Sequence, residues 1–270
     1  MTERRDGRYS QSLERGLAIL RCFGQDRPLL GIAEIADHVN MSRLTTHRYV
    51  TTLLALGFLE QDSSRKYRLG LGVTDLGLAA LGGSGIRRLA RPLLERLRPG
   101  NSYCAGLAVL DGAELCWLDT ANGASLRMSP GIPLIQPGAR APAHRTAEGK
   151  VLIAFQPAER RTALLSQVKL TPIGPNTIRT NRELLDQLDA VLDRGFALAD
   201  EEQAPGVRAI AAPVRDRSDE VIAAVSLTLE SSTMPLAKLA VALGPEVLAC
   251  ADRLSALLGH GAENGSAGAC

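Results

Sequence analysis

The stretch IAEIADHVNMSRLTTHRYVTTLLALGFLE, residues 32–60, contains two helical patterns separated by a break at Asn40-Met41. The apolar side chains of the first pattern fall on one helix face: Ile32, Ile35, Ala36 and Val39. Ser42 is then a good N-cap for a second helix, which runs to about Ala55 and ends at Gly57. Two helices joined by a tight turn are the arrangement of a helix-turn-helix.

The sequence on either side of this stretch completes the unit. Upstream, residues 12–23 predict a further helix. Its spaced leucines are Leu13, Leu17 and Leu20. Downstream, two short β-like runs, 58–61 and 66–69, flank the polar turn DSSR. Helix, helix, tight turn, helix and hairpin in this order predict a winged helix-turn-helix, which we assign to residues 1–82.

The second helix of the motif has a buried and an outer side. The inward stripe is Thr46, Tyr49, Val50 and Leu53. The N-cap and the outer and flanking side chains are Ser42, Arg43, Thr45, His47, Arg48 and Thr52, and the hairpin adds Arg65, Lys66 and Arg68. Arginine can bond both acceptors of a guanine, and short hydroxyls reach phosphates or bases. Any one of these residues, His47 above all, would also suit an ordinary solvated surface; as a set on this motif they predict binding to double-stranded DNA.

The charge distribution agrees with a nucleic-acid partner for the front of the chain. Residues 1–98 hold 16 Lys and Arg against 10 Asp and Glu, whereas residues 99–270 hold 15 against 19. A basic front end on an acidic body indicates that the front end meets a polyanion. Apolar residues make up 45% and aromatic residues only 3%, so the cores must be aliphatic.

No stretch approaches the roughly 18 uncharged apolar residues of a membrane span. We therefore expect a cytoplasmic protein without a membrane partner. The five cysteines are scattered, with no pairing at the spacing of a zinc site. We expect them to be reduced, and we expect no metal and no cofactor.

A connector joins the two halves of the chain. Residues 76–97 have a helical pattern, but GGSG at 82–85 weakens its middle, so we place the domain boundary there and a linker helix at 83–98. The leucines on one side of the linker helix suit packing against a second copy of the chain: Leu89, Leu93, Leu94 and Leu97. Residues 99–258 then form the second domain, and the small, polar residues 259–270 predict a disordered tail.

The second domain mixes strands and helices. Strand patterns occur at 105–110, 114–119, 196–200, 207–214 and 221–229, with the turn Asp111-Gly112 joining the first two. Helices are predicted from the cap Thr146 to Phe155, from Pro157 onward, from the capping box at Thr180 to Gly195, and over 236–258. The fold class is therefore α+β.

Five segments resemble the IclR (isocitrate lyase regulator) family of bacterial transcription factors, in the family's order. They are QSLERGLAIL (11–20), the stretch 32–60, LAVLDGAELCWLD (107–119), PAHRTAEGKVLIAF (142–155) and GFALADEEQAPGVRAIAAPVRD (195–216). The resemblance implies a GAF-like α/β effector-binding domain with a central antiparallel sheet, dimers or tetramers, and a palindromic operator. Three places depart from the family: the short segment at 98–106, Arg145 at a usually small position, and the glycines that interrupt the linker.

The resemblance also implies an effector pocket between the sheet and the helix after the PxHxTAxGK motif. The matching positions are His144, Thr146, Gly149, Asp200, Ala209, Ser226 and Thr228. A helix N-terminus favours an anion, and alternate strand residues face one side. Other roles stay open: Thr146 as a cap only, His144 as a loop anchor, and the two strand hydroxyls on the outer face. The segments 10–20 and 195–216 look most like the branch for aromatic-acid breakdown (protocatechuate, 4-hydroxybenzoate), so we expect an aromatic or small carboxylic acid.

Two other classes compete with a ligand-responsive regulator. One is an enzyme with Cys104 or Cys116 as nucleophile and His144 as base, but no acid or oxyanion feature accompanies them at a recognisable spacing. The other is a DNA-binding protein whose second domain serves only for oligomerisation. We favour a non-enzymatic transcription regulator, repressor or activator, whose DNA binding responds to a small molecule.

Overall fold

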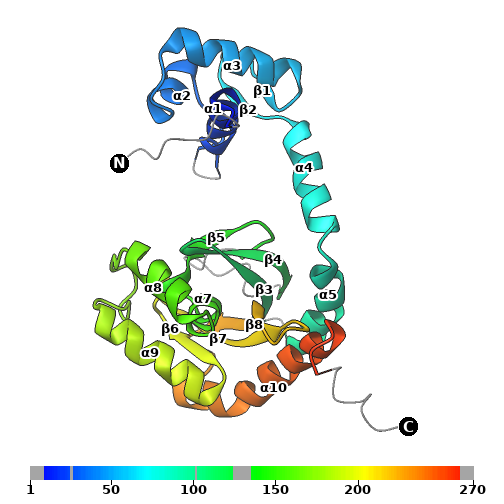
Figure 1. Ribbon diagram of the computed structural model, residues 1–270, viewed down its shortest axis with the longest axis vertical. Coiled ribbons are helices and arrows are strands. Elements are labelled where there is room, and N and C mark those ends of the chain that lie inside the picture. Colours follow the sequence, from blue (N-terminus) through cyan, green and yellow to red (C-terminus); the bar gives the residue numbers. More distant parts are fainter. Residues whose placement is uncertain (1–8, 25–26, 101, 124–134, 262–270) are drawn as a thin grey trace. The chain divides into compact units, whose positions relative to one another are not determined.

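The computed structural model describes residues 9–24, 27–100, 102–123 and 135–261 (Figure 1). The chain divides into two units after Gly83, and each is described by itself. Within the described residues, every helix is too short or too polar to cross a membrane.

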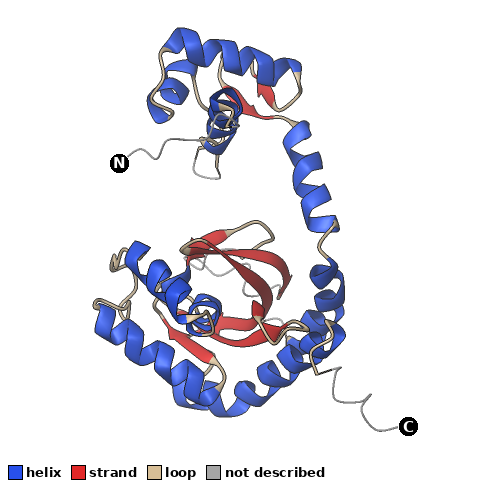
Figure 2. Cartoon of the chain, in the orientation of Figure 1, coloured by secondary structure: helices blue, strands red, loops and turns tan. Residues whose placement is uncertain are grey.

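The first unit is mainly helical (Figure 2). Its elements are α1 (Gln11–Arg21), α2 (Ile32–His38), α3 (Arg43–Ala55), β1 (Leu59–Gln61), β2 (Tyr67–Leu69) and α4 (Leu71–Gly82). The strands β1 and β2 pair antiparallel. The core side chains are Ile19, Cys22, Leu30, Ile35, Val50, Leu53, Leu59 and Tyr67. This order confirms the predicted winged helix-turn-helix.

The inward face of α1 is formed mainly by Ile19 and Cys22 rather than by its spaced leucines. Leu13 is 63% exposed and Leu17 is 45% exposed, whereas Ile19 is fully buried. The side chains of Ile19 and Cys22 lie in the core beside α3, and Leu20 packs against the same core. The predicted helix is therefore present, but two of its spaced leucines, Leu13 and Leu17, are exposed.

The second unit is built on a six-stranded antiparallel sheet with the strand order β5-β4-β3-β8-β7-β6. The strands are β3 (Tyr103–Asp111), β4 (Glu114–Asn122), β5 (Arg140–Pro142), β6 (Ala197–Asp200), β7 (Val207–Arg215) and β8 (Val221–Glu230). The helices are α5 (Gly85–Leu97), η1 (Ala143–Arg145), α7 (Ala147–Ala154), α8 (Ala158–Gln167), α9 (Asn181–Arg194) and α10 (Leu236–Leu257). The predicted α+β class and antiparallel sheet are confirmed; β5 was not predicted.

Helices cover both faces of this sheet (Figure 1). On one face, large aliphatic side chains such as Leu107, Ile210 and Leu227 pack with α5 and α10. On the other face, small side chains such as Ala209 and Ala211 pack with α7 and α9. The face toward α7 therefore carries smaller side chains than the face toward α5 and α10.

The leucines of α5 are packed within their own chain and are not free to contact a second copy. Leu93, Leu94 and Leu97 are buried, and Leu89 is half-buried, within the core that α5 forms with α10 and the sheet. The expectation that this face packs on a second chain is therefore corrected, because α10, distant in sequence, already covers it. As the glycines indicated, α4 ends at Gly82 and α5 begins at Gly85. Of the predicted tail, residues 262–270 lie outside the described residues.

Candidate functional site

The outer side of α3 presents the residues predicted to meet DNA. The side chain of Ser42 accepts a hydrogen bond from the Thr45 N–H at 3.2 Å, which begins the helix. Thr46, Val50 and Leu53 are buried. Arg43, His47 and Arg48 are exposed, and Thr45 is half-buried with its hydroxyl 2.8 Å from that of Ser42. One side of α3 is thus fixed in the core while the other carries cations and donors.

A groove runs along α3 beside α1. Its lining residues are Ser12, Arg15, Thr45, His47, Arg48, Tyr49, Thr51 and Thr52. Arg15 was not predicted, because the sequence pattern of α1 was interpreted through its leucines. Leu44 was also missed: it is 77% exposed near the start of α3, where an apolar side chain can contact a thymine methyl group.

The wing hairpin holds its turn through Asp62. The Asp62 Oδ1 atom accepts hydrogen bonds from the N–H groups of Ser64 and Lys66, at 2.9 and 3.0 Å, and from the Ser64 hydroxyl. The hydroxyl bond is the main reason that the pKa of Asp62 is lowered. Arg65 and Lys66 are exposed at the tip, whereas Arg68 donates to Glu60 at 2.8 Å and is already paired.

In the second unit, the strand register gathers three predicted effector positions on the face toward α7. Thr228 lies between Cys104 and Ala209 on the neighbouring strands, and Ser226 lies between Gly106 and Ala211. Ser226 and Thr228 are both buried, so they do not lie on a solvent-facing side of the sheet. Their neighbours on the adjacent strands are small residues, but Glu148 of α7 also contacts the Ser226 hydroxyl.

The start of α7 gathers three more predicted positions. The Thr146 hydroxyl accepts from the Gly149 N–H at 3.0 Å, so Thr146 caps the helix. A Cβ atom at Gly149 would lie 2.0 Å from the Ala143 carbonyl oxygen, so only glycine permits this close approach of α7 to η1. His144 is 2% exposed, and its Nε2 atom has no hydrogen-bond partner among the described residues. Burial, with a smaller effect of the Arg145 charge, lowers the pKa of His144 to about 4.

Asp200 does not join the other predicted positions. It pairs with Arg208 across the β6–β7 ladder, and its carboxylate accepts from the Arg208 Nε at 2.5 Å. Ala199, one residue earlier, is the partner of Ala209 on the α7 face. The expectation that Asp200 lines the same pocket is therefore corrected, because a shift of one residue along a strand moves the side chain to the other face.

Sequence reasoning missed the buried polar residues of α7. Glu148 is 1% exposed and accepts from the Trp117 Nε1 at 3.1 Å and from the Ser226 hydroxyl at 2.7 Å. Lys150 is fully buried and forms an ion pair with Glu202 at 2.7 Å. All eight residues of α7 are buried, so this helix has no exposed side and no periodic pattern to reveal its charged residues.

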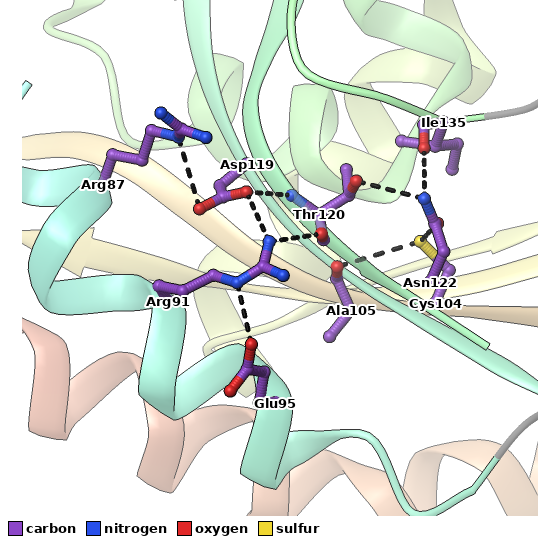
Figure 3. Close-up of polar contacts among 9 residues, drawn as sticks. All are labelled: Arg87, Arg91, Glu95, Cys104, Ala105, Asp119, Thr120, Asn122 and Ile135. Atoms are coloured by element: carbon purple, nitrogen blue, oxygen red, sulfur yellow. Dashed lines mark hydrogen bonds and ion pairs between the residues drawn. The ribbon is translucent and has the colours of Figure 1, made fainter. Parts of the chain in front are cut away.

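Alternate side chains of the strand β4 lie on the two faces of the sheet: Asp119 faces α5, and Thr120 and Asn122 lie on the opposite face (Figure 3). Arg91 of α5 donates to the Asp119 carboxylate and to the Thr120 carbonyl, each at 3.0 Å, and Arg87 lies 3.4 Å from Asp119 (Figure 3). On the other face, Asn122 donates to the Thr120 hydroxyl at 3.2 Å and accepts from the Cys104 thiol at 2.8 Å. A single strand thus contacts α5 through Asp119 and the backbone of Thr120, and carries the Thr120 and Asn122 side chains on the sheet face toward α7.

The two cysteines considered as nucleophiles lack the required ionisation. Burial raises the pKa of Cys104 to about 12, and the nearby charge of Glu148 adds to the effect. Burial also raises the pKa of Cys116. A thiol rather than a thiolate is expected at both positions at neutral pH, which disfavours cysteine catalysis.

Comparisons with known proteins agree with both units. The family model described as "IclR helix-turn-helix domain" matches residues 12–63, and the one described as "Bacterial transcriptional regulator IclR C-terminal" matches residues 78–256. The HTH-type transcriptional regulator XynR of Escherichia coli K12 is 34% identical over 85% of this chain and 90% of its own length. The Pca operon regulatory protein of Acinetobacter baylyi is 32% identical over 85% of this chain and 82% of its own.

A solved structure extends the likeness to the fold. The crystal structure of an IclR homologue complexed with 4-hydroxybenzoate, from Microbacterium hydrocarbonoxydans, superposes with a TM-score of 0.74. It shares 26% sequence identity with this chain, and the match covers 91% of this chain and 99% of that one. With both units matched in order, the chain belongs to the IclR family of bacterial transcriptional regulators.

Proposed function

We propose that this regulator binds a palindromic operator through α3 and the wing, and that a small carboxylic acid held between α7 and the sheet modulates that binding. The observation that carries the proposal is the presence, in one chain, of an exposed cationic recognition helix and a sheet face lined by small side chains beneath the start of α7. The expected location is the cytoplasm, and no catalytic activity is assigned.

We assign the DNA contacts from the exposure of each polar side chain and from the helix or hairpin that carries it. Arg43 and Arg48 on α3 suit the major groove, with Ser42, Thr45 and His47 beside them. Arg65 and Lys66 at the wing tip suit the neighbouring backbone or minor groove, and Arg68 contributes less because Glu60 already engages it. The groove beside α1 adds Arg15 to this surface.

The effector proposal rests on the start of α7. The first N–H groups of a helix have no partner within the helix, and the Thr146 hydroxyl satisfies that of Gly149. Among the described residues, no partner engages the N–H groups of Ala147 and Glu148, which suits an anionic group. The buried Nε2 of His144, for which the described part of the chain supplies no hydrogen-bond partner, is a second polar group close by in sequence. The 4-hydroxybenzoate in the related crystal structure supports an aromatic acid as the ligand class.

Exposed leucines support self-association. Leu13 and Leu17 on α1, and Leu71, Leu76 and Leu78 on α4, are all exposed large apolar side chains. A homodimer, or a homotetramer of two dimers, would cover such surfaces and set two recognition helices one DNA turn apart, or a multiple of it. A ligand acts on such an assembly only if it binds one arrangement better than the other.

The test combines stability with DNA binding. Thermal unfolding of the full chain is followed with 4-hydroxybenzoate, protocatechuate and a panel of small aliphatic acids, and active acids are added to mobility shifts with the DNA upstream of the gene. An acid at 100 times its dissociation constant should add about 2.7 kcal/mol of stability and change the shift. If no acid stabilises the chain while DNA binding persists, the second unit serves only for oligomerisation or binds another ligand class.

A further inference from the structure

The residue that sequence and family resemblance left unassigned is Glu148, the second residue of α7. Its carboxylate is buried between three strands and the helix. It accepts from the Trp117 Nε1 of β4 at 3.1 Å and from the Ser226 hydroxyl of β8 at 2.7 Å. On β3 between them, a Cβ atom at Gly106 would lie 3.0 Å from the Ser226 Oγ and 3.3 Å from the Trp117 ring. The bare glycine lets the three side chains meet, so the carboxylate is held in one place.

The carboxylate retains unused acceptor capacity. Both bonds end on the same oxygen, Oε1, whereas an ionised carboxylate has about four lone-pair positions. Among the described residues, no hydrogen bond reaches the Oε2 atom of Glu148. Hydrogen bonds to a charged oxygen are stronger than those between neutral groups. A donor on a bound molecule would use the free acceptor positions of this carboxylate.

The hydrogen bond from Ser226 to Glu148 also limits which ligand groups this region can bind. The Ser226 hydroxyl directs its proton to Glu148 and so cannot donate it to an acid in the same site. The charge of Glu148 also acts on the sheet face toward α7, where Cys104 lies. After burial, it is the second cause of the raised pKa of Cys104. This part of the face therefore repels an acid group and favours a hydrogen-bond donor.

We propose that Glu148 selects the effector by accepting a hydrogen bond from a hydroxyl group of the bound acid. The inference rests on the proposed function, since it takes the acid to bind between α7 and the sheet. It narrows the ligand class to acids that carry a hydroxyl group away from the carboxylate. The acid group then lies toward the N–H groups at the start of α7 and the hydroxyl toward Glu148.

The test uses matched pairs of acids on the full chain. Dissociation constants are measured by calorimetry for 4-hydroxybenzoate against benzoate, and for 4-hydroxybutyrate against butyrate. In at least one pair, the hydroxylated acid should bind at least tenfold tighter, and Glu148→Met should abolish most of that preference. The control is Glu159→Met, which changes the same residue type at the same helical position of α8, where it is exposed.

The outcomes separate this inference from the proposed function. If the hydroxylated acid and its parent acid bind with equal affinity in every pair that binds, the role of Glu148 is refuted, but the proposed acid site is not. An unchanged preference in Glu148→Met has the same consequence. Binding of neither member of either pair to the wild-type chain overturns the acid effector and the role of Glu148 together. If Glu148→Met does not fold, the wild-type ratio alone decides.

Discussion

Arg48 and Lys66 are both exposed cations of the first unit, but they occupy different elements, α3 and the wing turn. A side chain that bonds base edges affects sequence preference, whereas one that meets phosphates affects all DNA alike. We predict that Arg48→Ala costs about 1–3 kcal/mol in operator binding and relaxes base preference. Lys66→Ala should weaken binding to all sequences and lower the salt slope by about 1.

Quantitative mobility shifts with the upstream DNA and with single-base variants, at several salt concentrations, compare the two substitutions. Unchanged affinity and preference in Arg48→Ala would show that α3 does not read the bases. A loss of preference in Lys66→Ala would exchange the roles assigned to the helix and the wing.

His144 makes a pH prediction possible. Its pKa is about 4 in the folded chain, against 6.5 without burial, so the unfolded chain binds more protons between these values. The free energy of unfolding should therefore have its full value above about pH 6.5 and fall as the pH drops toward 4, by up to about 3 kcal/mol. His144→Gln should remove this part of the pH dependence. Urea unfolding at intervals from pH 4.5 to 7.5 measures it, and equal slopes in both chains would refute the assignment.

At the scale of elements, α7 depends on one glycine. A methyl group at Gly149 would overlap the Ala143 carbonyl, so Gly149→Ala should destabilise the second unit by about 3 kcal/mol. Gly77 on α4 has open space around its Cβ position, and Gly77→Ala should be neutral or add up to about 1 kcal/mol. Urea unfolding followed by circular dichroism compares them. Equal effects would mean that α7 does not pack on η1 this closely.

The attachment of α5 to β4 gives a second element-scale prediction. The side chain of Asp119 is 2% exposed and faces Arg87 and Arg91 (Figure 3), so Asp119→Asn leaves two cations without their shared carboxylate. We expect a loss of about 2 kcal/mol in the free energy of unfolding, because the arginines are partly solvated and recover some hydration. Glu95→Gln removes the exposed partner of Arg91 and should cost less than about 0.5 kcal/mol. A smaller effect at Asp119 than at Glu95 would contradict the account.

The elements also show what the sequence could predict. Caps, turns and alternation located every strand of the sheet except β5 and placed α7, α9 and α10 closely, because those signals are local. The partner of the α5 leucines depends on a distant segment and was assigned wrongly, because α10 covers that face. At Asp200 the error was one residue, since the side-chain period of a strand is two while the matched motif gave only an approximate register.

For the whole molecule, the distribution of charge between the two units agrees with the separate roles proposed for them. The front of the chain is basic and the rest acidic, as expected if only the first unit meets DNA. The buried charges of the second unit, Glu148 and the Lys150–Glu202 pair, could not be predicted, because sequence patterns assign charged residues to exposed faces. Hydrophobic periodicity therefore fails most clearly at α7, where every residue is buried, including Glu148 and Lys150.

The most direct test of the central claim is a fluorescence titration of the wild-type chain with duplex DNA from upstream of its gene. A scrambled duplex of the same length and composition serves as the comparison, and salt concentration is varied. The account predicts binding at least about 10³-fold tighter to the upstream duplex, with affinity for both falling as salt rises. Equal affinity for the two duplexes at every salt concentration would contradict it.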